Sequence, residues 1–72
     1  MSKYNIALFP ERLFALVDAC ALSVKEIAAN VGVSAHMLER FMRGESLPKA
    51  SIFCKICDLF HVRADYLLGA DE

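Results

Sequence analysis

The sequence predicts an all-α fold of five short helices with a central helix-turn-helix. Apolar residues recur at spacings of three and four, and no segment alternates as a strand does. Serine, glycine and proline separate these segments into short units. A chain of 72 residues, of which 57% are hydrophobic, forms at most one small domain and is too apolar for intrinsic disorder.

The first helix is expected over residues 10–21. Pro10 fits the first turn of a helix, where its missing N–H costs nothing. An apolar stripe at helical spacing follows, formed by Leu13, Leu16, Val17 and Cys20.

The second helix is expected over residues 24–31. Ser23 and Glu26 have the Ser-x-x-Glu spacing of a capping box, and Gly32 is a left-handed stop. The inward face consists of Ile27, Ala28 and Val31.

The third helix is expected over residues 35–43, with Ser34 as its N-cap. Leu38 and Phe41 point inward, and the helix ends at Gly44. Since these segments flank a short turn, residues 23–44 form a helix-turn-helix.

Two more helices are expected, over residues 49–60 and 64–68, after a loop that ends at Pro48. Gly69 stops the last helix. The broad apolar face of the fourth helix consists of Ile52, Phe53, Ile56, Leu59 and Phe60. We expect an N-terminal arm over 1–8, the helical domain over 9–69 and a C-terminal tail over 70–72.

The spacing within the helix-turn-helix is itself informative. Ala28 is small where the two helices must approach, and Gly32 lies four residues later, where the turn requires a positive φ. Val33 and Leu38 then anchor the second helix of the pair.

Short motifs along residues 9–69 resemble the Cro/C1-type (XRE-like) helix-turn-helix family. They are Pro-Glu-Arg-Leu at 10–13, Leu-Ser at 22–23, Glu-Ile-Ala at 26–28, Val-Gly-Val-Ser at 31–34, Arg-Gly at 43–44, Pro48, Lys-Ile at 55–56 and Asp-Tyr-Leu-Leu-Gly at 65–69. The resemblance implies the five-helix fold of the phage (lambda) repressors. It also implies a homodimeric transcriptional regulator of the repressor kind, with helix 35–43 in the major groove of double-stranded DNA.

Four positions depart from the family's pattern. Val24 replaces a glutamine, Ala35-His36-Met37 replace polar residues, Met42 replaces a glutamate, and His61 replaces a glycine. Val24, Ala35, Met37 and Met42 put apolar groups where polar ones are usual, although at least one of the two methionines is expected to pack against the fourth helix. These residues favour an alternative function, a protein–protein interaction module that kept the fold and lost its DNA readout.

Charge is unevenly distributed, although the net charge is only −1. Residues 25–55 hold five basic and three acidic side chains, and the remaining residues hold three basic and six acidic ones. The positive segment coincides with the helix-turn-helix, which is the distribution sought in a nucleic-acid binder. Ordinary scatter of surface charge is the alternative.

Three side chains on the third helix are candidates for contact with base edges. Arg40 is the strongest, because a guanidinium can bond guanine O6 and N7 together. His36 suits a base edge or a phosphate, and Glu39 can accept from cytosine N4. The alternative is that they are solvated residues without a partner.

Phosphate contacts are expected from residues that flank these candidates. Arg43 ends the third helix and Lys49 begins the fourth. The other predicted DNA-binding residues are Lys25, Ser34 and Ala35. For Ser34, the N-cap role is by itself a sufficient reason for a serine at this position.

Other chemistries find little support. Cys54 and Cys57 form a CxxC, but inside a helix and without a second ligand pair, so we expect no metal site and no cofactor. No constellation of catalytic residues occurs, so the protein is expected not to be an enzyme and to take no small-molecule ligand. Three cysteines, no secretory signal and no apolar run of about 18 residues predict a cytoplasmic protein without a membrane segment.

Apolar residues beyond the predicted core have two interpretations, a homodimer surface and additional core. Tyr66, Leu67 and Leu68 lie in the last helix, and the others are Phe14, Phe53, Phe60, Tyr4, Ile6 and Leu8.

Overall fold

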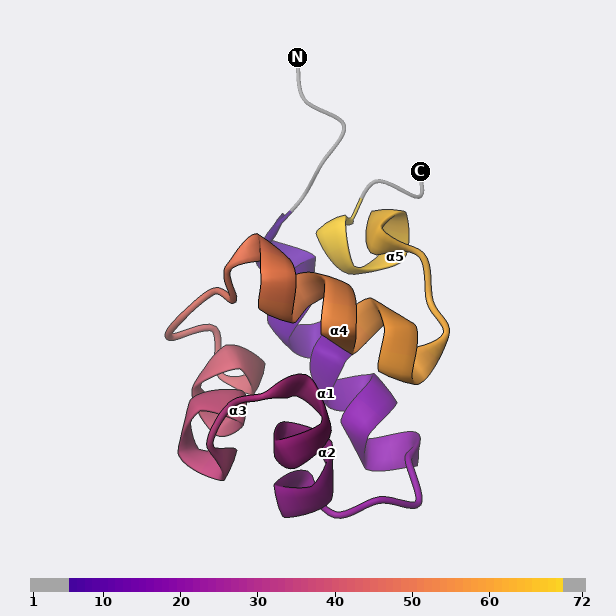
Figure 1. Cartoon of the computed structure of the whole chain (residues 1–72). Coiled ribbons are helices and arrows are strands. Elements are labelled where there is room, and N and C mark those ends of the chain that lie inside the picture. The colour runs from indigo at the N-terminus through magenta and orange to yellow at the C-terminus, as the bar shows by residue number, and fades with distance from the viewer. Residues whose placement is uncertain (1–5, 70–72) are drawn as a thin grey trace.

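The computed structural model describes residues 6–69 and confirms the predicted all-α class. Within this range there are helices and no strands. In chain order they are η1 (Ile6–Leu8, a 3₁₀ turn), α1 (Phe9–Ala19), α2 (Val24–Val31), α3 (Ala35–Met42), α4 (Ala50–Phe60) and α5 (Ala64–Leu68) (Figure 1).

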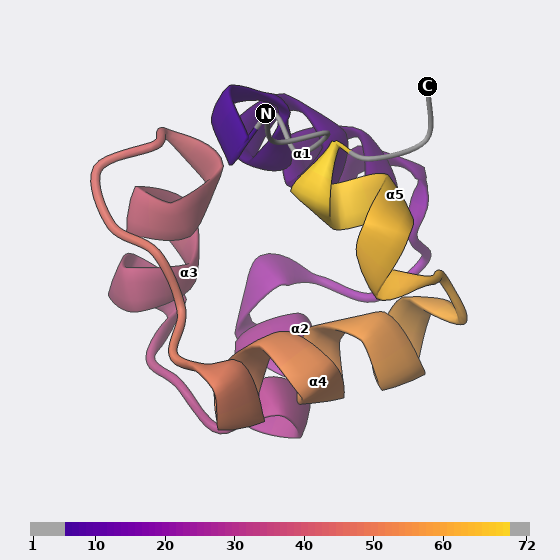
Figure 2. The same cartoon turned by 90° about the horizontal axis from the view of Figure 1, so that it is seen from above.

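The helices surround one interior rather than stacking in layers. α1 packs against α3 and α5, and α2 packs against α3 and α4. Seen from above, α3 lies at one edge of the molecule, and a long connection runs outward from it to α4 (Figure 2). α3 therefore has one face toward the interior and one toward solvent.

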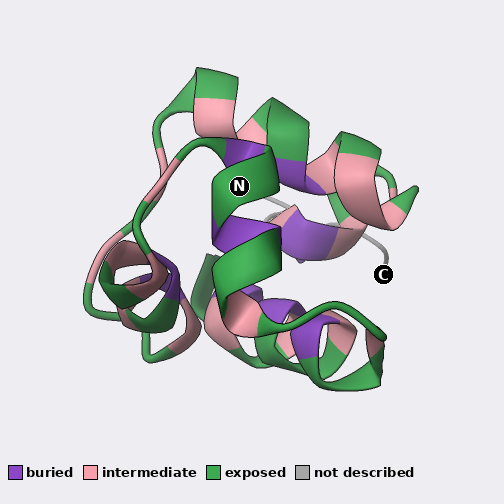
Figure 3. Ribbon diagram, turned by 60° about the horizontal axis from the view of Figure 1, so that its bottom comes forward, coloured by how far each residue is buried: buried purple, intermediate pink, exposed green. Residues whose placement is uncertain are grey.

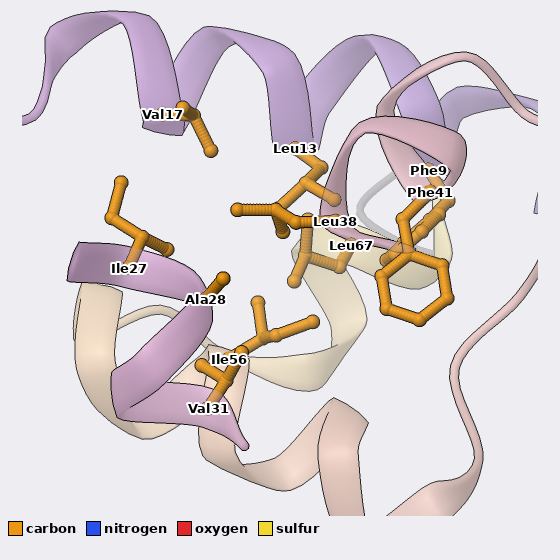
Figure 4. Packing of buried hydrophobic residues seen from close by; sticks show 10 residues of the cluster. All are labelled: Phe9, Leu13, Val17, Ile27, Ala28, Val31, Leu38, Phe41, Ile56 and Leu67. Carbon is orange, nitrogen blue, oxygen red and sulfur yellow. The ribbon is translucent and has the colours of Figure 1, made fainter. Parts of the chain in front are cut away.

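The core draws on all five α-helices. Its buried residues converge on one interior (Figure 4), and buried positions lie where helices face one another (Figure 3). Burying a leucine, isoleucine or phenylalanine contributes about 1.5–3 kcal/mol. The buried hydrophobic residues are Phe9, Leu13, Val17, Ile27, Ala28, Val31, Leu38, Phe41, Ile56 and Leu67. None of the buried side chains among residues 6–69 is polar or charged.

Four predicted helix ends move by one or two residues. α1 starts at Phe9 and stops at Ala19, because Cys20 adopts an extended conformation (φ −85°, ψ 144°). Arg43 is the C-cap of α3 rather than its last residue, with ψ near zero (−2°). Lys49 is the extended N-cap of α4, so that helix begins one residue later than predicted.

The predicted N-terminal caps are present. The Glu26 amide donates to the Ser23 hydroxyl at 3.1 Å, and the Ser23 amide donates to the Glu26 carboxylate at 2.8 Å. This reciprocal pair is the capping box of α2. At the start of α3 the Met37 amide donates to Ser34 Oγ at 3.1 Å. In both helices of the helix-turn-helix, the N-cap side chain therefore accepts a hydrogen bond from a first-turn amide and fixes where the helix begins.

α4 ends in a left-handed residue that is not glycine. His61 has φ 55° and is the only such non-glycine residue among those described. The Val62 amide donates to the Cys57 carbonyl at 3.1 Å, as in a Schellman motif. A side chain in this conformation costs about 1–2 kcal/mol, which explains why glycine is usual here.

The N-terminal segment joins α5. η1 packs against α1 and α5. Arg12 of α1 donates to the Tyr66 carbonyl at 2.6 Å and lies over the Tyr66 ring, 4.7 Å from its centroid. The predicted tail over 70–72, residues 1–5 of the predicted arm and the apolar candidate Tyr4 lie outside the described residues.

Candidate nucleic-acid interface

α3 is anchored by two buried side chains and presents an exposed face on its opposite side. Leu38 is 0% exposed and Phe41 is 3% exposed. His36 and Glu39 are exposed. The helix lies at the edge of the molecule in two perpendicular views (Figures 1 and 2). An exposed helix of this kind fits the major groove, which is wide enough to admit an α-helix.

The turn between α2 and α3 has the predicted geometry. Gly32 has φ +83°, and the Val33 amide donates to the Ala28 carbonyl at 3.0 Å. Ala28 is 2% exposed, so a larger side chain would not fit there. A Cβ on Gly32 would lie 3.6 Å from Lys55 Nζ, which places this lysine amine beside the turn.

The end of α3 gathers charged groups around Glu45. Gly44 adopts φ +76°, and the Glu45 amide donates to the Arg40 carbonyl at 3.0 Å in a second Schellman motif. This turn brings Glu45 back alongside α3. The Arg43 Nε donates to Glu45 Oε2 at 3.1 Å, and Arg43 Nη2 donates to Oε1 at 3.4 Å.

Arg40 contacts the same residue. Its Nη2 donates to the Glu45 backbone carbonyl at 3.4 Å, and its Nε lies 3.7 Å from Glu45 Oε1. Two predicted DNA-contacting arginines thus share one carboxylate that the sequence reasoning did not include. The signal was present, because a glycine between Arg43 and Glu45 allows the tight turn that joins them.

The electrostatics of Glu45 reflect this arrangement. The hydrogen bond from Arg43 lowers the pKa of the Glu45 carboxyl, and the charges of Arg43, Arg40 and His36 act in the same direction against partial desolvation. His36, Arg40 and Arg43 therefore act on a single point of the surface. Because the pairs are exposed, each contributes little to stability.

Three of the four remaining predicted contacts, Lys49, Ser34 and Ala35, lie at or beside α3. Lys49 lines a shallow hollow together with Met37 of α3 and Ile52 of α4. Ser34 caps α3, and Ala35 is its half-buried first residue. Lys25 is exposed near the start of α2, and no hydrogen bond or ion pair found within residues 6–69 joins it to α3.

The apolar departures from the family's pattern turn inward. Val24, Met37 and Met42 are each half-buried and pack against the core. The exposed large hydrophobic residues of the described range are all outside α3, namely Ile6, Phe14, Leu22 and Leu47. The apolar side chains that favoured an interaction module are therefore turned mainly toward the core.

The CxxC has no partners for metal binding. Cys54 is exposed and Cys57 half-buried on α4, and burial raises the pKa of the Cys57 thiol, with smaller effects of Cys54 and Asp58 in the same direction. Residues 6–69 contain no group of three or more histidine, cysteine or acidic side chains suited to a metal ion. No helix in this range is long and apolar enough to cross a membrane.

The fold, with α2 and α3 joined by a tight turn, is that of a helix-turn-helix domain. A family model described as a helix-turn-helix domain matches residues 10–68. The chain belongs to this family, which confirms the resemblance to Cro/C1-type domains. None of the curated proteins matches the chain.

Two solved structures have the same fold. One is the solution structure of the SOS-response transcriptional repressor LexA from Eubacterium rectale, with a TM-score of 0.84 and 22% identity over 93% of this chain and 71% of that one. The other is the crystal structure of the P22 c2 repressor in complex with synthetic operator 9T in the presence of Tl⁺. Its TM-score is 0.81, with 24% identity over 88% of this chain and 96% of that one.

Proposed function

We propose that this protein is a cytoplasmic, sequence-specific transcriptional repressor that binds DNA as a homodimer and inserts α3 into the major groove. The observation that carries the proposal is the arrangement of α3. Its inner face is fixed by Leu38 and Phe41. Its outer side carries the exposed His36, together with Arg40 and Arg43, which both pair with Glu45. The P22 c2 repressor, which has the same fold, was solved with an operator.

Base readout is assigned to the outer face of α3. Arg40 turns the Nε–Nη2 edge of its guanidinium toward Glu45: Nη2 donates one hydrogen to the Glu45 backbone carbonyl, and Nε is in ion-pair distance of the carboxylate. The two Nη1 hydrogens and the second Nη2 hydrogen point away from that edge and remain for guanine O6 and N7. His36 and Glu39 flank Arg40 on exposed positions and are assigned to neighbouring base edges, with Glu39 accepting from cytosine N4.

Phosphate contacts are assigned to the periphery. Arg43, at the C-cap of α3, and Lys49, at the N-cap of α4, are both exposed. Lys25 would reach the backbone from the start of α2. Ser34 and Ala35 would approach a phosphate with the N-terminal end of α3, where free amides and the helix dipole favour an anion.

The homodimer is assigned to an apolar groove. It is lined by Ile6, Phe9, Leu47, Pro48, Ala50, Phe53 and Leu68. Ile6 and Leu47 expose 45% and 59% of their surface, which a second copy would cover. A two-fold dimer then presents two α3 helices to half-sites about 10 base pairs apart.

DNA binding is tested by selecting bound sequences from a random duplex pool. The selected site and a random duplex are then titrated at low and moderate salt. We expect a defined half-site sequence and affinity that falls steeply with salt, since phosphate contacts release counterions. A folded sample that binds no duplex at any salt contradicts the proposal.

The dimer is tested by molar mass in solution over a range of protein concentrations. Leu47→Asp is expected to give a monomer that keeps its fold, because this side chain is largely exposed. Phe14→Asp is the control, since Phe14 is 56% exposed but lies outside the groove. Dissociation by Phe14→Asp alone would move the interface to another face, and a monomeric wild type would exclude the dimer.

A further inference from the structure

The carboxylate of Glu45 joins both candidate DNA-contacting arginines, Arg40 and Arg43. It bonds Arg43 through two nitrogen atoms and lies 3.7 Å from Arg40 Nε. Fork geometry of this kind adds direction to an ion pair as well as energy. In the free protein both guanidinium groups are therefore already oriented and partly neutralised.

This arrangement affects two kinds of DNA contact differently. A phosphate competes directly with Glu45, because both are anions that bind a guanidinium. A guanine edge does not compete in this way, because it offers neutral acceptors. It can bond Nη1 and the second hydrogen of Nη2, whereas Glu45 contacts Arg40 through Nε and the first hydrogen of Nη2. The carboxylate also repels the DNA backbone as the two surfaces approach.

Resting on the proposed function, we infer that Glu45 is a specificity-determining residue that weakens binding to random duplex while holding Arg40 in position for a base edge. Part of specificity lies in disfavouring the wrong partner. Glu45 supplies that repulsive element next to the attractive one.

The geometry makes this role independent of folding. Glu45 lies in the exposed connection after α3, and its side chain is 50% exposed. The turn that places it depends on backbone hydrogen bonds of Gly44 and Glu45. Replacing the carboxylate by an amide therefore keeps the turn and removes only the charge.

The test is Glu45→Gln, measured on a random duplex and on the selected site over a series of salt concentrations. We expect the affinity for random duplex to rise roughly three- to tenfold at low salt, the effect of freeing two exposed ion pairs. The slope of log affinity against log salt is expected to steepen by about 1, since about one more phosphate is neutralised. Affinity for the selected site is expected to rise less. The ratio of affinity for the selected site to affinity for random duplex therefore falls.

Glu11→Gln is the matched control. It makes the same chemical change at another exposed glutamate, which is in the first turn of α1 and takes part in no ion pair described among residues 6–69. If Glu11→Gln raised the affinity for random duplex equally, the effect would come from net charge, and the inference would be overturned. A double-mutant cycle with Arg43→Ala measures how much of the effect comes from the Arg43–Glu45 pair. Glu45→Gln is expected to raise the affinity for random duplex less when Arg43 is absent.

The other outcomes are also decisive. Unchanged or weaker binding of random duplex by Glu45→Gln, with wild type binding normally, overturns the inference and leaves the proposed function standing. Absence of DNA binding in both proteins, with both folded, overturns the proposed function and the inference with it. Thermal unfolding of each variant establishes that it is folded.

Discussion

The two faces of α3 have opposite relations to their surroundings. Leu38 and Phe41 on the inner face are almost fully buried among apolar side chains. On the outer side His36 and Glu39 are exposed, and Arg40 and Arg43 make exposed ion pairs with Glu45. Burial fixes the position of the helix, while exposed charges contribute little to that position. The readout surface can therefore change without loss of the fold.

The largest effect is expected from Leu38→Ala, which removes an inner-face anchor. The lost burial and the cavity should lower the free energy of unfolding by about 2–5 kcal/mol, measured by urea denaturation. Glu39→Ala, at the next position, should change it by no more than about 0.5 kcal/mol. Similar losses in the two variants would show that the two faces do not differ as described.

Arg40→Ala tests the outer face without touching the inner one. We expect selectivity at one base position to fall by about 1–3 kcal/mol, measured by competition between duplexes that differ at that base. The free energy of unfolding should be unchanged within about 0.5 kcal/mol. An equal loss on every sequence would make Arg40 a phosphate contact instead.

Ser34→Ala removes the N-cap side chain at the start of α3. Because the Ser34 hydroxyl accepts from the Met37 amide, its loss should cost about 1 kcal/mol of stability. Ser34→Asn restores an N-cap acceptor and should recover most of this cost. If both variants unfold like wild type, the cap contributes nothing and α3 is held by its buried residues alone.

The smallest effect is expected from His61→Gly, away from both faces. Relief of the left-handed conformation, about 1–2 kcal/mol, is offset by the backbone entropy of glycine, about 0.5–1 kcal/mol. The free energy of unfolding should rise by up to about 1 kcal/mol, measured by thermal unfolding. His61→Ala keeps the strain and should give no gain, and destabilisation by glycine would show that the His61 side chain itself is needed.

Local sequence signals predicted the helices well because the interactions concerned are local. The capping box of Ser23 and Glu26 joins residues three apart, and the apolar stripe of α1 lies on neighbouring turns. Helix ends were less accurate at Cys20 and Lys49, since one residue more or less costs little at a fraying end.

Parts of the candidate interface were beyond the same reasoning. The sequence showed Met37 and Met42 on the third helix but not that both pack inward against the core. Their direction depends on how α3 is rotated relative to the other helices. That rotation is decided by the burial of Leu38 and Phe41 and not by the methionines.

The sequence by itself determined the helix-turn-helix, its caps and the positive charge around it, because periodicity, capping and composition depend on near neighbours. The tertiary structure alone decided which surfaces stay open. It assembled the apolar groove from η1, the connection before α4, and parts of α1, α4 and α5. It also placed the Glu45 carboxylate against two arginines. Both features depend on the packed directions of side chains, which linear spacing does not specify.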